Sequence, residues 1–561
     1  MGRVTGALEL LHPDPAVAAV RAGLLEHWRD TGRFRPDTLI DLVDRAAAED
    51  PDARLAFASQ THPGETRVGD LAERTRAVAA AFVALGVRPG DVVAIQLPNW
   101  PVTIEAYLGA VAAGAVIVPI VHTYGPAETG WILEASGASV LVCPDRWTTI
   151  DFHARLDAIP WAERGTVVMV GDDTHAGALA WNDFLAAGAD RPDPLALPTL
   201  APADPLLVVY TSGTTAEPKG VLHSHETFVA ELLRMSQAPP ERRDWVVVQP
   251  WPAGHVAGLL AICSPLITRS TTILIDRWDV DLLGSYIERY RPIAITGAPF
   301  HLGELLARAE AGTLDASSIR YAVTGGASVP PVLVERADAA GWSVTRSYGS
   351  SEHPQATTTL FDDDLAVRIT SDGGPMVDTE IRVVEPDGTD AEVGVAGEIV
   401  LRGPQQFLGY TDPALNAAAV DQDGWFHTGD VGVLDAHGRL TVPDRLKDII
   451  IRGGENLSSM EIEAIAVRHP AIADAAAIGV PDPRYGERVG LVVVPAPGAP
   501  AVTVDELRAF FAEAGVGAVK TPELVACVDV LPRNPSGKVT KHVLRETIDW
   551  TRAGTRSGGP S

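Results

Sequence analysis

The sequence predicts an α/β protein in which parallel sheets are covered by helices, followed by a β-rich subdomain and a small α+β domain. Short apolar strands alternate with helical patterns through the first 200 residues and then again to residue 324. Strand–helix alternation favours parallel sheets with helices on their faces. From Ile381 short strands separated by turns replace this alternation, and another change of pattern follows Asp444. A chain of 561 residues has room for several domains of ordinary size.

The elements expected in the first part follow from apolar periodicity and from signals at their ends. Val68–Leu85 has a helical rhythm that stops at Gly86, and Ile104–Ala113 and Ala127–Ser136 repeat that rhythm. The Pro- and Asp-rich segment 190–205 predicts an extended connector. Strands are expected at the short apolar runs Val92–Leu97, Val116–Ile120, Val140–Cys143, Leu206–Val209, Trp245–Gln249, Thr272–Ile275, Ile293–Thr296 and Tyr321–Thr324.

The last part of the chain predicts a small α+β domain. Ser458 and Glu461 have the spacing of a capping box that opens a helix to His469, and Thr503 with Glu506 repeats the signal for a helix to Ala514. Strands are expected at Ala475–Val480 and Leu491–Val494. We therefore expect a large domain over residues 1–443 with its β-rich subdomain from about 378 to 443, a hinge at 444–448, a small domain at 449–550 and a disordered tail at 551–561.

Composition limits the class of function. The 73 acidic and 45 basic side chains give a net charge of −28, which disfavours nucleic acid and anionic membranes as partners because those require a basic surface. The longest apolar run, Ala106–Val121, is too short for a membrane span. Cys143, Cys263 and Cys527 lie far apart in apolar stretches, which indicates buried thiols in a reducing compartment. A cytoplasmic protein is expected.

The most specific chemical motif is YTSGTTAEPKG at residues 210–220, directly after the strand LLVVY. Its hydroxyl groups and glycine let backbone N–H groups crowd around phosphate oxygens, and Lys219 adds a mobile positive charge. A Walker loop is excluded, because Pro218 and Gly220 stand where that motif needs Gly and then Ser or Thr. The segment therefore predicts a phosphate-binding loop of another kind.

This loop resembles the phosphate loop of the adenylate-forming superfamily, in the branch of acyl-CoA synthetases and carboxylate–CoA ligases. Further segments match that family in its own order: TGGAS at 324–328, SYGSSE at 347–352, GWFHTGD at 424–430, DRLKDIIIRGGENLSSMEIE at 444–463 and LPRNPSGKVTK at 531–541. The resemblance implies a large N-terminal domain of stacked sheets in αβαβα order. It also implies a small, mobile C-terminal domain that rotates at the hinge between two half-reactions.

The resemblance assigns a role to individual residues. Lys538, Glu352, Thr211 and Lys219 would be catalytic, and Glu352 would hold Mg²⁺ against the phosphates of ATP. Lys447 matches the hinge residue. The nucleotide would contact Thr211, Ser212, Gly213, Thr214, Thr215, Lys219, Gly325, Gly326, Ala327, Tyr348, Gly349, Ser350, Ser351, Asp430 and Arg445. Gly453, Gly454 and Glu455 match the loop of the thiol tunnel, and His255 with Gly258 matches the acyl pocket.

The implied activity is that of an ATP-dependent carboxylate–CoA ligase that uses ATP, Mg²⁺ and coenzyme A. The acid attacks the α-phosphate to give an acyl-adenylate and pyrophosphate, and the thiol of CoA then takes the acyl group and releases AMP. Two alternatives stay open: a homologue that performs one half-reaction or loads a separate carrier protein, and a nucleotide- or acyl-binding pseudoenzyme. Ala216 motivates them, because it stands where the family usually has a second glycine and restricts positive φ.

The sequence says less about the acyl substrate than about the reaction. The segments PWPAGHVAGL and YGSSEHP resemble those of bacterial ligases for alicyclic or medium-sized carboxylic acids, and VAGLL lacks the Asp that amino-acid-activating relatives place there. His223 and His225 could bind a metal, but the family has Ser-His after its phosphate loop, which favours a structural role. The expected partners are a small carboxylic acid and CoA, with no nucleic acid and no membrane span, and a homodimer is left open.

Overall fold

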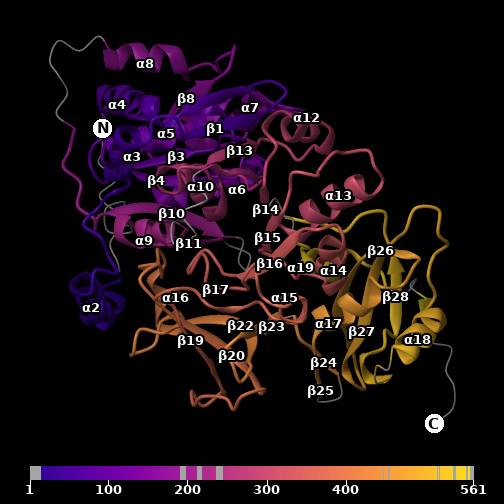
Figure 1. Ribbon diagram of the computed structural model, residues 1–561. Coiled ribbons are helices and arrows are strands. Elements are labelled where there is room, and N and C mark those ends of the chain that lie inside the picture. Colours follow the sequence, from indigo (N-terminus) through magenta and orange to yellow (C-terminus); the bar gives the residue numbers. More distant parts are fainter. Residues whose placement is uncertain are drawn as a thin grey trace.

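The computed structural model in Figure 1 describes residues 14–163, 165–189, 197–211, 218–235, 244–445, 448–452, 455–514, 516, 518–534, 538–550 and 554–555. These residues form two large sheets with helices on their faces, then a four-stranded sheet (orange), then a smaller unit built on a six-stranded sheet (yellow). The predicted α/β class and the order of its parts are confirmed. The exact domain boundaries remain predictions.

The first sheet has eight strands in the order β21-β11-β10-β4-β3-β5-β8-β9. The strands from β10 to β9 in this order run parallel, whereas β11 and β21 pair antiparallel. The bounds are β3 (Val92–Ile95), β4 (Val116–Pro119), β5 (Val140–Pro144), β8 (Thr166–Val170), β9 (Leu179–Ala180), β10 (Pro205–Thr211), β11 (Lys219–Ser224) and β21 (Gly409–Tyr410). A separate short hairpin joins β6 (Arg146–Trp147) to β7 (Ile150–Asp151).

The second sheet has nine strands in the order β18-β17-β16-β15-β14-β12-β13-β1-β2. The inner strands from β16 to β1 run parallel, as the alternation of strands and helices predicts. The bounds are β1 (Arg54–Ala58), β2 (Gly64–Arg67), β12 (Val246–Gln249), β13 (Thr271–Ile275), β14 (Ala294–Gly297), β15 (Tyr321–Gly325), β16 (Ser343–Tyr348), β17 (Thr357–Thr358) and β18 (Gly374–Pro375).

The apolar cores establish the order of the layers. One core joins Ile95 and Val209 of the first sheet to Phe57 and Leu274 of the second through helices that lie between the sheets. A second core covers the outer face of the first sheet, and a third covers the outer face of the second. The layers therefore stack as αβαβα, as the resemblance implies.

The helices divide among these layers. Those between the sheets include α3 (Leu39–Glu49), α4 (Val68–Ala84), α5 (Pro101–Ala112), α9 (His225–Met235), α10 (Val256–Cys263) and α11 (Pro265–Thr268). The outer layers include α6 (Pro126–Ser136) and α7 (Phe152–Asp157) on one side, and α12 (Val280–Tyr290), α13 (Pro299–Glu310) and α14 (Pro331–Ala339) on the other. The remaining helices of this part are α2 (Pro15–Asp30), α8 (Trp181–Ala189), α15 (Leu365–Thr370) and α16 (Pro413–Ala419).

The β-rich subdomain and the small unit follow. The four-stranded antiparallel sheet contains β19 (Glu380–Val384), β20 (Ala396–Arg402), β22 (Phe426–Leu434) and β23 (Leu440–Arg445). The small unit contains β24 (Ile450–Arg452), β25 (Glu455–Leu457), β26 (Ile472–Asp482), β27 (Gly486–Pro495), β28 (Leu524–Cys527), β29 (Gly554–Thr555), α17 (Ser459–Ala466), α18 (Val504–Glu513) and α19 (Lys541–Thr547). Its own apolar core excludes the large domain, which fits a part that can move as a body.

Two local predictions need correction. Ser458 caps α17 by accepting from the backbone of Glu461, but the reciprocal bond is absent because the Glu461 carboxylate binds Lys520 at 2.7 Å instead. The capping box at Thr503, in contrast, is complete. Cys143 and Cys263 are buried as expected, whereas Cys527 is exposed, because it ends β28 beyond the cores that cover Leu524 and Val525.

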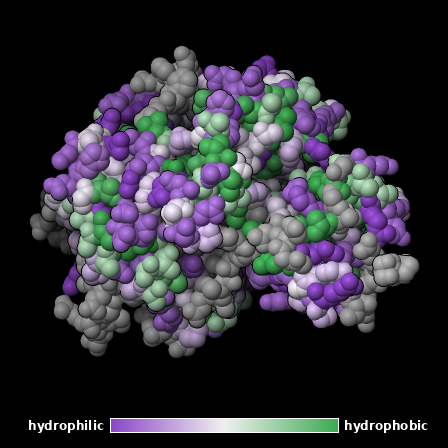
Figure 2. Space-filling model, turned by 90° about the horizontal axis from the view of Figure 1, so that it is seen from below, coloured by the Kyte–Doolittle hydropathy of each residue, from purple (hydrophilic) through white to green (hydrophobic). Residues whose placement is uncertain are grey.

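Polar and apolar side chains are interspersed on the face of the molecule shown in Figure 2. No helix in the described part of the chain combines the length and the apolar character needed to cross a bilayer.

Candidate active site

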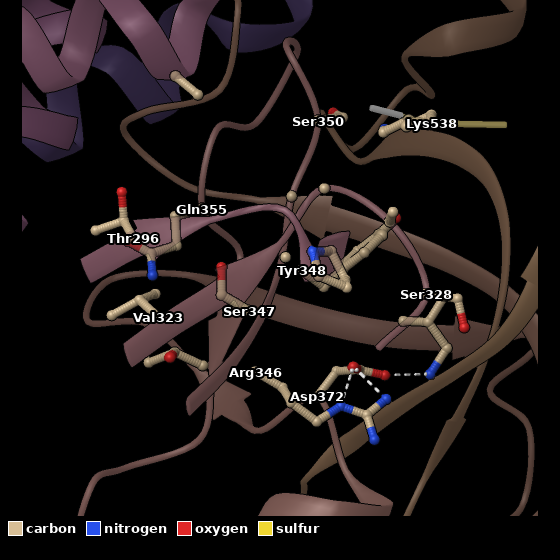
Figure 3. Close-up of a pocket in the computed structure, with 18 of the residues that line it drawn as sticks. Thr296, Val323, Ser328, Arg346, Ser347, Tyr348, Ser350, Gln355, Asp372 and Lys538 are labelled. Atoms are coloured by element: carbon tan, nitrogen blue, oxygen red, sulfur yellow. Dashed lines mark hydrogen bonds and ion pairs between the residues drawn. The ribbon is translucent and has the colours of Figure 1, made fainter. Parts of the chain in front are cut away.

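One continuous cavity of about 2090 Å³ connects the ends of strands in both large sheets with the loops of the small unit. Figure 3 shows part of it, with Tyr348 in the centre, Thr296 on one side and Lys538 entering from the other. The predicted site residues on its wall are Thr211, Lys219, His255, Gly325, Gly326, Ala327, Tyr348, Gly349, Ser350, Ser351, Glu352, Asp430 and Lys538. The fold thus brings together motifs that are spread over more than half of the sequence.

The predicted phosphate loop connects two paired strands. Thr211 ends β10, Lys219 begins β11, and the two residues face each other in the antiparallel ladder. The Lys219 ammonium lies 5.2 Å from the ring centroid of Tyr410. Ser212, Gly213, Thr214, Thr215 and Ala216 lie outside the described residues.

Glycines at the ends of β15 and β16 have no room for a side chain. A Cβ on Gly325 would clash with the carbonyl oxygen of Ser347, and one on Gly349 would clash with that of Pro354. Gly326 has a φ of +74°, which favours glycine, and it faces the ring of Trp251. Bare backbone therefore forms this part of the wall, where a flat ring can approach closely.

Tyr348 and Asp430 lie side by side. The Tyr348 hydroxyl donates to Oδ2 of Asp430 at 2.7 Å. The Asp430 backbone N–H in turn donates to the Thr428 hydroxyl at 3.1 Å, which fixes the strand end. Arg445 pairs with Asp430 across the β22–β23 ladder, so its backbone lies beside this carboxylate.

Glu352 fits the requirements of a magnesium site. Its Oε1 accepts from the hydroxyl of Tyr410 at 2.7 Å, which orients the carboxylate at the cavity wall near Lys219. Burial, together with the Glu352 charge, raises the pKa of Tyr410, so this hydroxyl remains a donor. No group of three or more His, Cys, Asp or Glu side chains in the described chain could hold a metal by itself. One carboxylate with phosphate oxygens and water is the usual environment of Mg²⁺.

Lys538 and His255 line the same cavity. The backbone N–H of Lys538 donates to Oδ1 of Asn534 at 2.9 Å, and the backbone N–H of Asn534 donates to the carbonyl of Lys538 at 2.8 Å. Burial lowers the pKa of His255 to about 4, and the charge of Lys538 contributes to this shift. His255 is therefore neutral at pH 7, and within the described part of the chain its buried Nε2 has no hydrogen-bond partner.

The remaining predicted residues divide into three groups. Gly258 was expected in the acyl pocket, but it lies behind the cavity wall, where any Cβ would overlap the carbonyl of Pro252. Glu455 begins β25, the strand after the expected thiol-tunnel turn. Lys447, Gly453 and Gly454 lie outside the described residues.

His223 and His225 have structural contacts. His223 bonds to the Ser351 carbonyl at 2.8 Å and to the Thr227 hydroxyl at 3.1 Å, and burial lowers its pKa to about 4. His225 accepts from the backbone of Leu39 at 3.1 Å. His223 thus holds the segment before Glu352 in place.

The sequence analysis missed the supports behind Glu352. Besides Tyr410, the backbone N–H of Phe407 donates to the Glu352 carbonyl at 2.8 Å. The buried guanidinium of Arg21 in turn donates to the carbonyl of Phe407, 386 residues away in the sequence. A buried tyrosine needs a partner for its hydroxyl, and that need was the available signal for Tyr410.

The strand pair β10–β11, the Glu352 carboxylate, the Tyr348–Asp430 pair and Lys538 thus lie around one cavity, in the arrangement expected for an adenylate-forming enzyme. The chain belongs to the AMP-binding enzyme family, which it matches over residues 43–411, and it matches the AMP-binding enzyme C-terminal domain over residues 461–538.

Three relatives illustrate the similarity. The chain is 36% identical to the 3-[(3aS,4S,7aS)-7a-methyl-1,5-dioxo-octahydro-1H-inden-4-yl]propanoyl:CoA ligase of Mycobacterium tuberculosis. The alignment extends over 515 residues and covers 90% of this chain and 97% of the relative. It is 30% identical to the medium-chain fatty-acid–CoA ligase of Escherichia coli, over 94% of this chain and 90% of the relative. ATP-bound MatB from Rhodopseudomonas palustris superposes with a TM-score of 0.79 at 28% identity, over 91% and 98% of the two chains.

The protein is therefore an AMP-forming acid–thiol ligase. It makes an acyl-adenylate from ATP and a carboxylic acid, and then an acyl-CoA thioester. Its substrates are ATP, CoA and a carboxylic acid, and Mg²⁺ is typical of the family.

Proposed function

We propose that this ligase activates a medium-sized, ring-bearing carboxylic acid, with Lys538 acting in the first half-reaction only. The observation that carries the proposal is the shared cavity, which is lined by Lys538, by Glu352 and by the apolar side chains of α10 that we assign to an acyl channel. The alicyclic acid in the name of the mycobacterial relative supports this substrate class.

In the first half-reaction, the carboxylate oxygen attacks the α-phosphate and pyrophosphate leaves. We propose that Tyr348 and Asp430 hold the nucleoside, with bare backbone at Gly325, Gly326 and Ala327 beside the base and Arg445 near the ribose. Glu352 would hold Mg²⁺, which would neutralise phosphate charge. The Lys538 ammonium would lie between the incoming carboxylate and the α-phosphate and stabilise the charge that develops there.

The phosphates need donors from the loop between β10 and β11. We propose that Ser212, Gly213, Thr214 and Thr215 supply backbone and hydroxyl groups, between Thr211 and Lys219 at the two strand ends. The segment of Gly349, Ser350 and Ser351 would complete this phosphate site. His223 supports that segment through its bond to the Ser351 carbonyl.

In the second half-reaction, the CoA thiol attacks the acyl carbon and AMP leaves with the bonding electrons. We propose that the small domain, at about residues 449–550, rotates at a hinge that includes Lys447. This rotation would withdraw Lys538 and bring Gly453, Gly454 and Glu455 beside the thiol. We propose that the arrangement described above, with Lys538 at the cavity wall, is the adenylate-forming state.

The substrate class is tested by a screen for acyl-CoA formation. Purified protein is incubated with ATP, Mg²⁺, CoA and aryl, alicyclic, fatty and polycyclic acids, and AMP and thioester are measured together by chromatography and mass spectrometry. The proposal predicts the highest kcat/KM among ring-bearing acids. A clear preference for saturated fatty acids would contradict it.

Location and assembly are also proposals. We propose that the ligase works in the cytoplasm, where ATP and CoA are available, and fractionation of the source cells tests this. Light scattering of the purified protein would distinguish a homodimer from a monomer.

A further inference from the structure

The nine-stranded sheet presents two different faces along the same strands. Val248, Ile295, Ala322 and Val344 point into the outer apolar core under α12, α13 and α14, and each is at most 2% exposed. Their sequence neighbours point to the opposite face, since side chains alternate along a strand. Those neighbours line the cavity: Val247, Gln249, Ala294, Thr296, Val323 and Thr345.

This second face forms one wall of a deep channel. The channel is lined along β12 by Trp245, Val247 and Gln249. Because a strand rises by about 3.3 Å per residue, these residues span about 13 Å of the channel. Helix α10 also lines it, through Val256, Ala257, Leu260 and Ala261.

A polar network crosses this otherwise apolar channel. The Trp251 indole N–H donates to the Thr296 hydroxyl at 3.0 Å, and that hydroxyl donates to Oε1 of Gln249 at 2.8 Å. Nε2 of Gln249 donates to the Ser264 hydroxyl at 3.4 Å. Gln249 and Ser264 are 6% and 2% exposed, so the network is built into the wall. Figure 3 shows Thr296 at this end of the cavity, across from Lys538.

The network fixes the orientation of the Gln249 amide. The Ser264 hydroxyl donates its own hydrogen to the Ala261 carbonyl at 2.8 Å, so toward Gln249 it can only accept, and Oε1 of Gln249 faces the Thr296 hydroxyl. The amide nitrogen then lies on the other side, where it carries two hydrogens. Ser264 takes one of them in a long bond, and the second has no hydrogen-bond partner among the residues that the structure describes. A buried donor without a partner is unfavourable unless a ligand satisfies it.

We propose that Gln249 donates a hydrogen bond to a carbonyl oxygen on the carbon skeleton of the acid, so that the preferred substrates are oxo acids with a ketone remote from the carboxylate. The proposal rests on the proposed function, since it concerns the same acyl channel. A donor selects a ketone over a methylene group, because the methylene would leave the amide unpaired.

The test compares matched pairs of acids on three skeletons: 7-oxooctanoate with octanoate, 3-(4-oxocyclohexyl)propanoate with 3-cyclohexylpropanoate, and an oxo-hydrindane propanoate with its deoxo analogue. The wild-type ligase should prefer the oxo acid by about tenfold or more in kcat/KM on the skeleton that it uses best. Gln249→Met and Gln249→Asn, which remove or withdraw the donor, should reduce that ratio to about one. Ser264→Ala, the matched control, leaves the donor in place and should keep the ratio.

The outcomes separate the two proposals. Equal use of both members of a pair by the wild type overturns the oxo-acid inference and leaves the ligase activity intact. A ratio that survives both Gln249 variants, or that is lost in Ser264→Ala alone, also overturns it. If the wild type uses none of the six acids, the proposed ring-bearing substrate class fails with it. The ratio compares two acids on the same preparation of one variant, so a partial loss of folded protein does not affect it.

Discussion

Replacing Lys538 by Ala should separate the two half-reactions. The lysine reaches the cavity from the small domain, whereas the phosphate-loop strands belong to the large sheet. Lys538 lines the cavity, and its charge contributes to the lowered pKa of the buried His255. We therefore expect the ammonium to act only while the small domain holds this orientation, which is the orientation that forms the adenylate.

The magnitude follows from one lost charge contact. Two unit charges at about 4 Å in a medium of effective dielectric of about 20 interact by about 4 kcal/mol. That energy corresponds to about a thousandfold in rate, and removal of a single stabilising donor from an active site typically costs about a hundred- to a thousandfold. Lys538→Ala should therefore slow acyl-adenylate formation by at least about a hundredfold.

The assay measures each half-reaction separately. Pyrophosphate release from ATP and acid reports the first, and thioester formation from synthetic acyl-adenylate and CoA reports the second, which should remain near the wild-type rate. Lys520→Ala is the matched control, because Lys520 belongs to the same domain but forms a partly exposed ion pair with Glu461. If Lys538→Ala slows both half-reactions equally, the lysine has a structural role. If the rate of the first half-reaction is unchanged, Lys538 does not act in adenylate formation.

Three further predictions concern other parts of the site. Glu352→Gln should strongly reduce adenylate formation at saturating Mg²⁺ with little change in thermal stability, and unchanged pyrophosphate release would exclude Glu352 as the metal ligand. Ala216→Gly should preserve or raise the adenylation rate, since glycine widens the backbone choices of the loop; a large loss would show that the methyl group is needed. The hydrogen bond to Glu398 raises the pKa of His427, so this pair stabilises the fold fully below pH ~6.5 and loses its effect as pH rises through the raised pKa. His427→Gln should therefore lower the free energy of unfolding more at pH 5.5 than at pH 9, by less than about 1 kcal/mol for this partly exposed pair. Denaturant unfolding at the two pH values measures the difference, and a pH-independent effect would refute the ion pair.

Sequence patterns predicted the strands and helices well, because the apolar periodicity and the end signals of an element lie within a few residues of it. Val68–Leu85 was expected as a helix that stops at Gly86, and α4 covers Val68–Ala84, with Gly86 at a φ of +100°. The expected strand Trp245–Gln249 corresponds to β12, shifted by one residue. The motifs also placed most of the candidate site residues on one cavity wall.

Contacts between distant segments could not be predicted in the same way. No periodicity connects Arg21 to the carbonyl of Phe407, or Tyr410 to Glu352, since these pairs form only once the layers have packed. The resemblance assigned Gly258 to the acyl pocket. The carbonyl of Pro252 occupies the space that a Cβ of Gly258 would need, and the sequence does not reveal this close contact.

The two faces of β12 have a consequence for how this enzyme can change over evolutionary time. Val248 supports the core, so most substitutions there would lower stability, whereas its neighbour Val247 lies on the opposite face and lines the cavity. Mutations at the channel positions can therefore alter which acid is accepted at little cost to folding. A lineage carrying this sheet could explore new acids by changing alternate residues, while the adenylation chemistry at the strand ends stays the same.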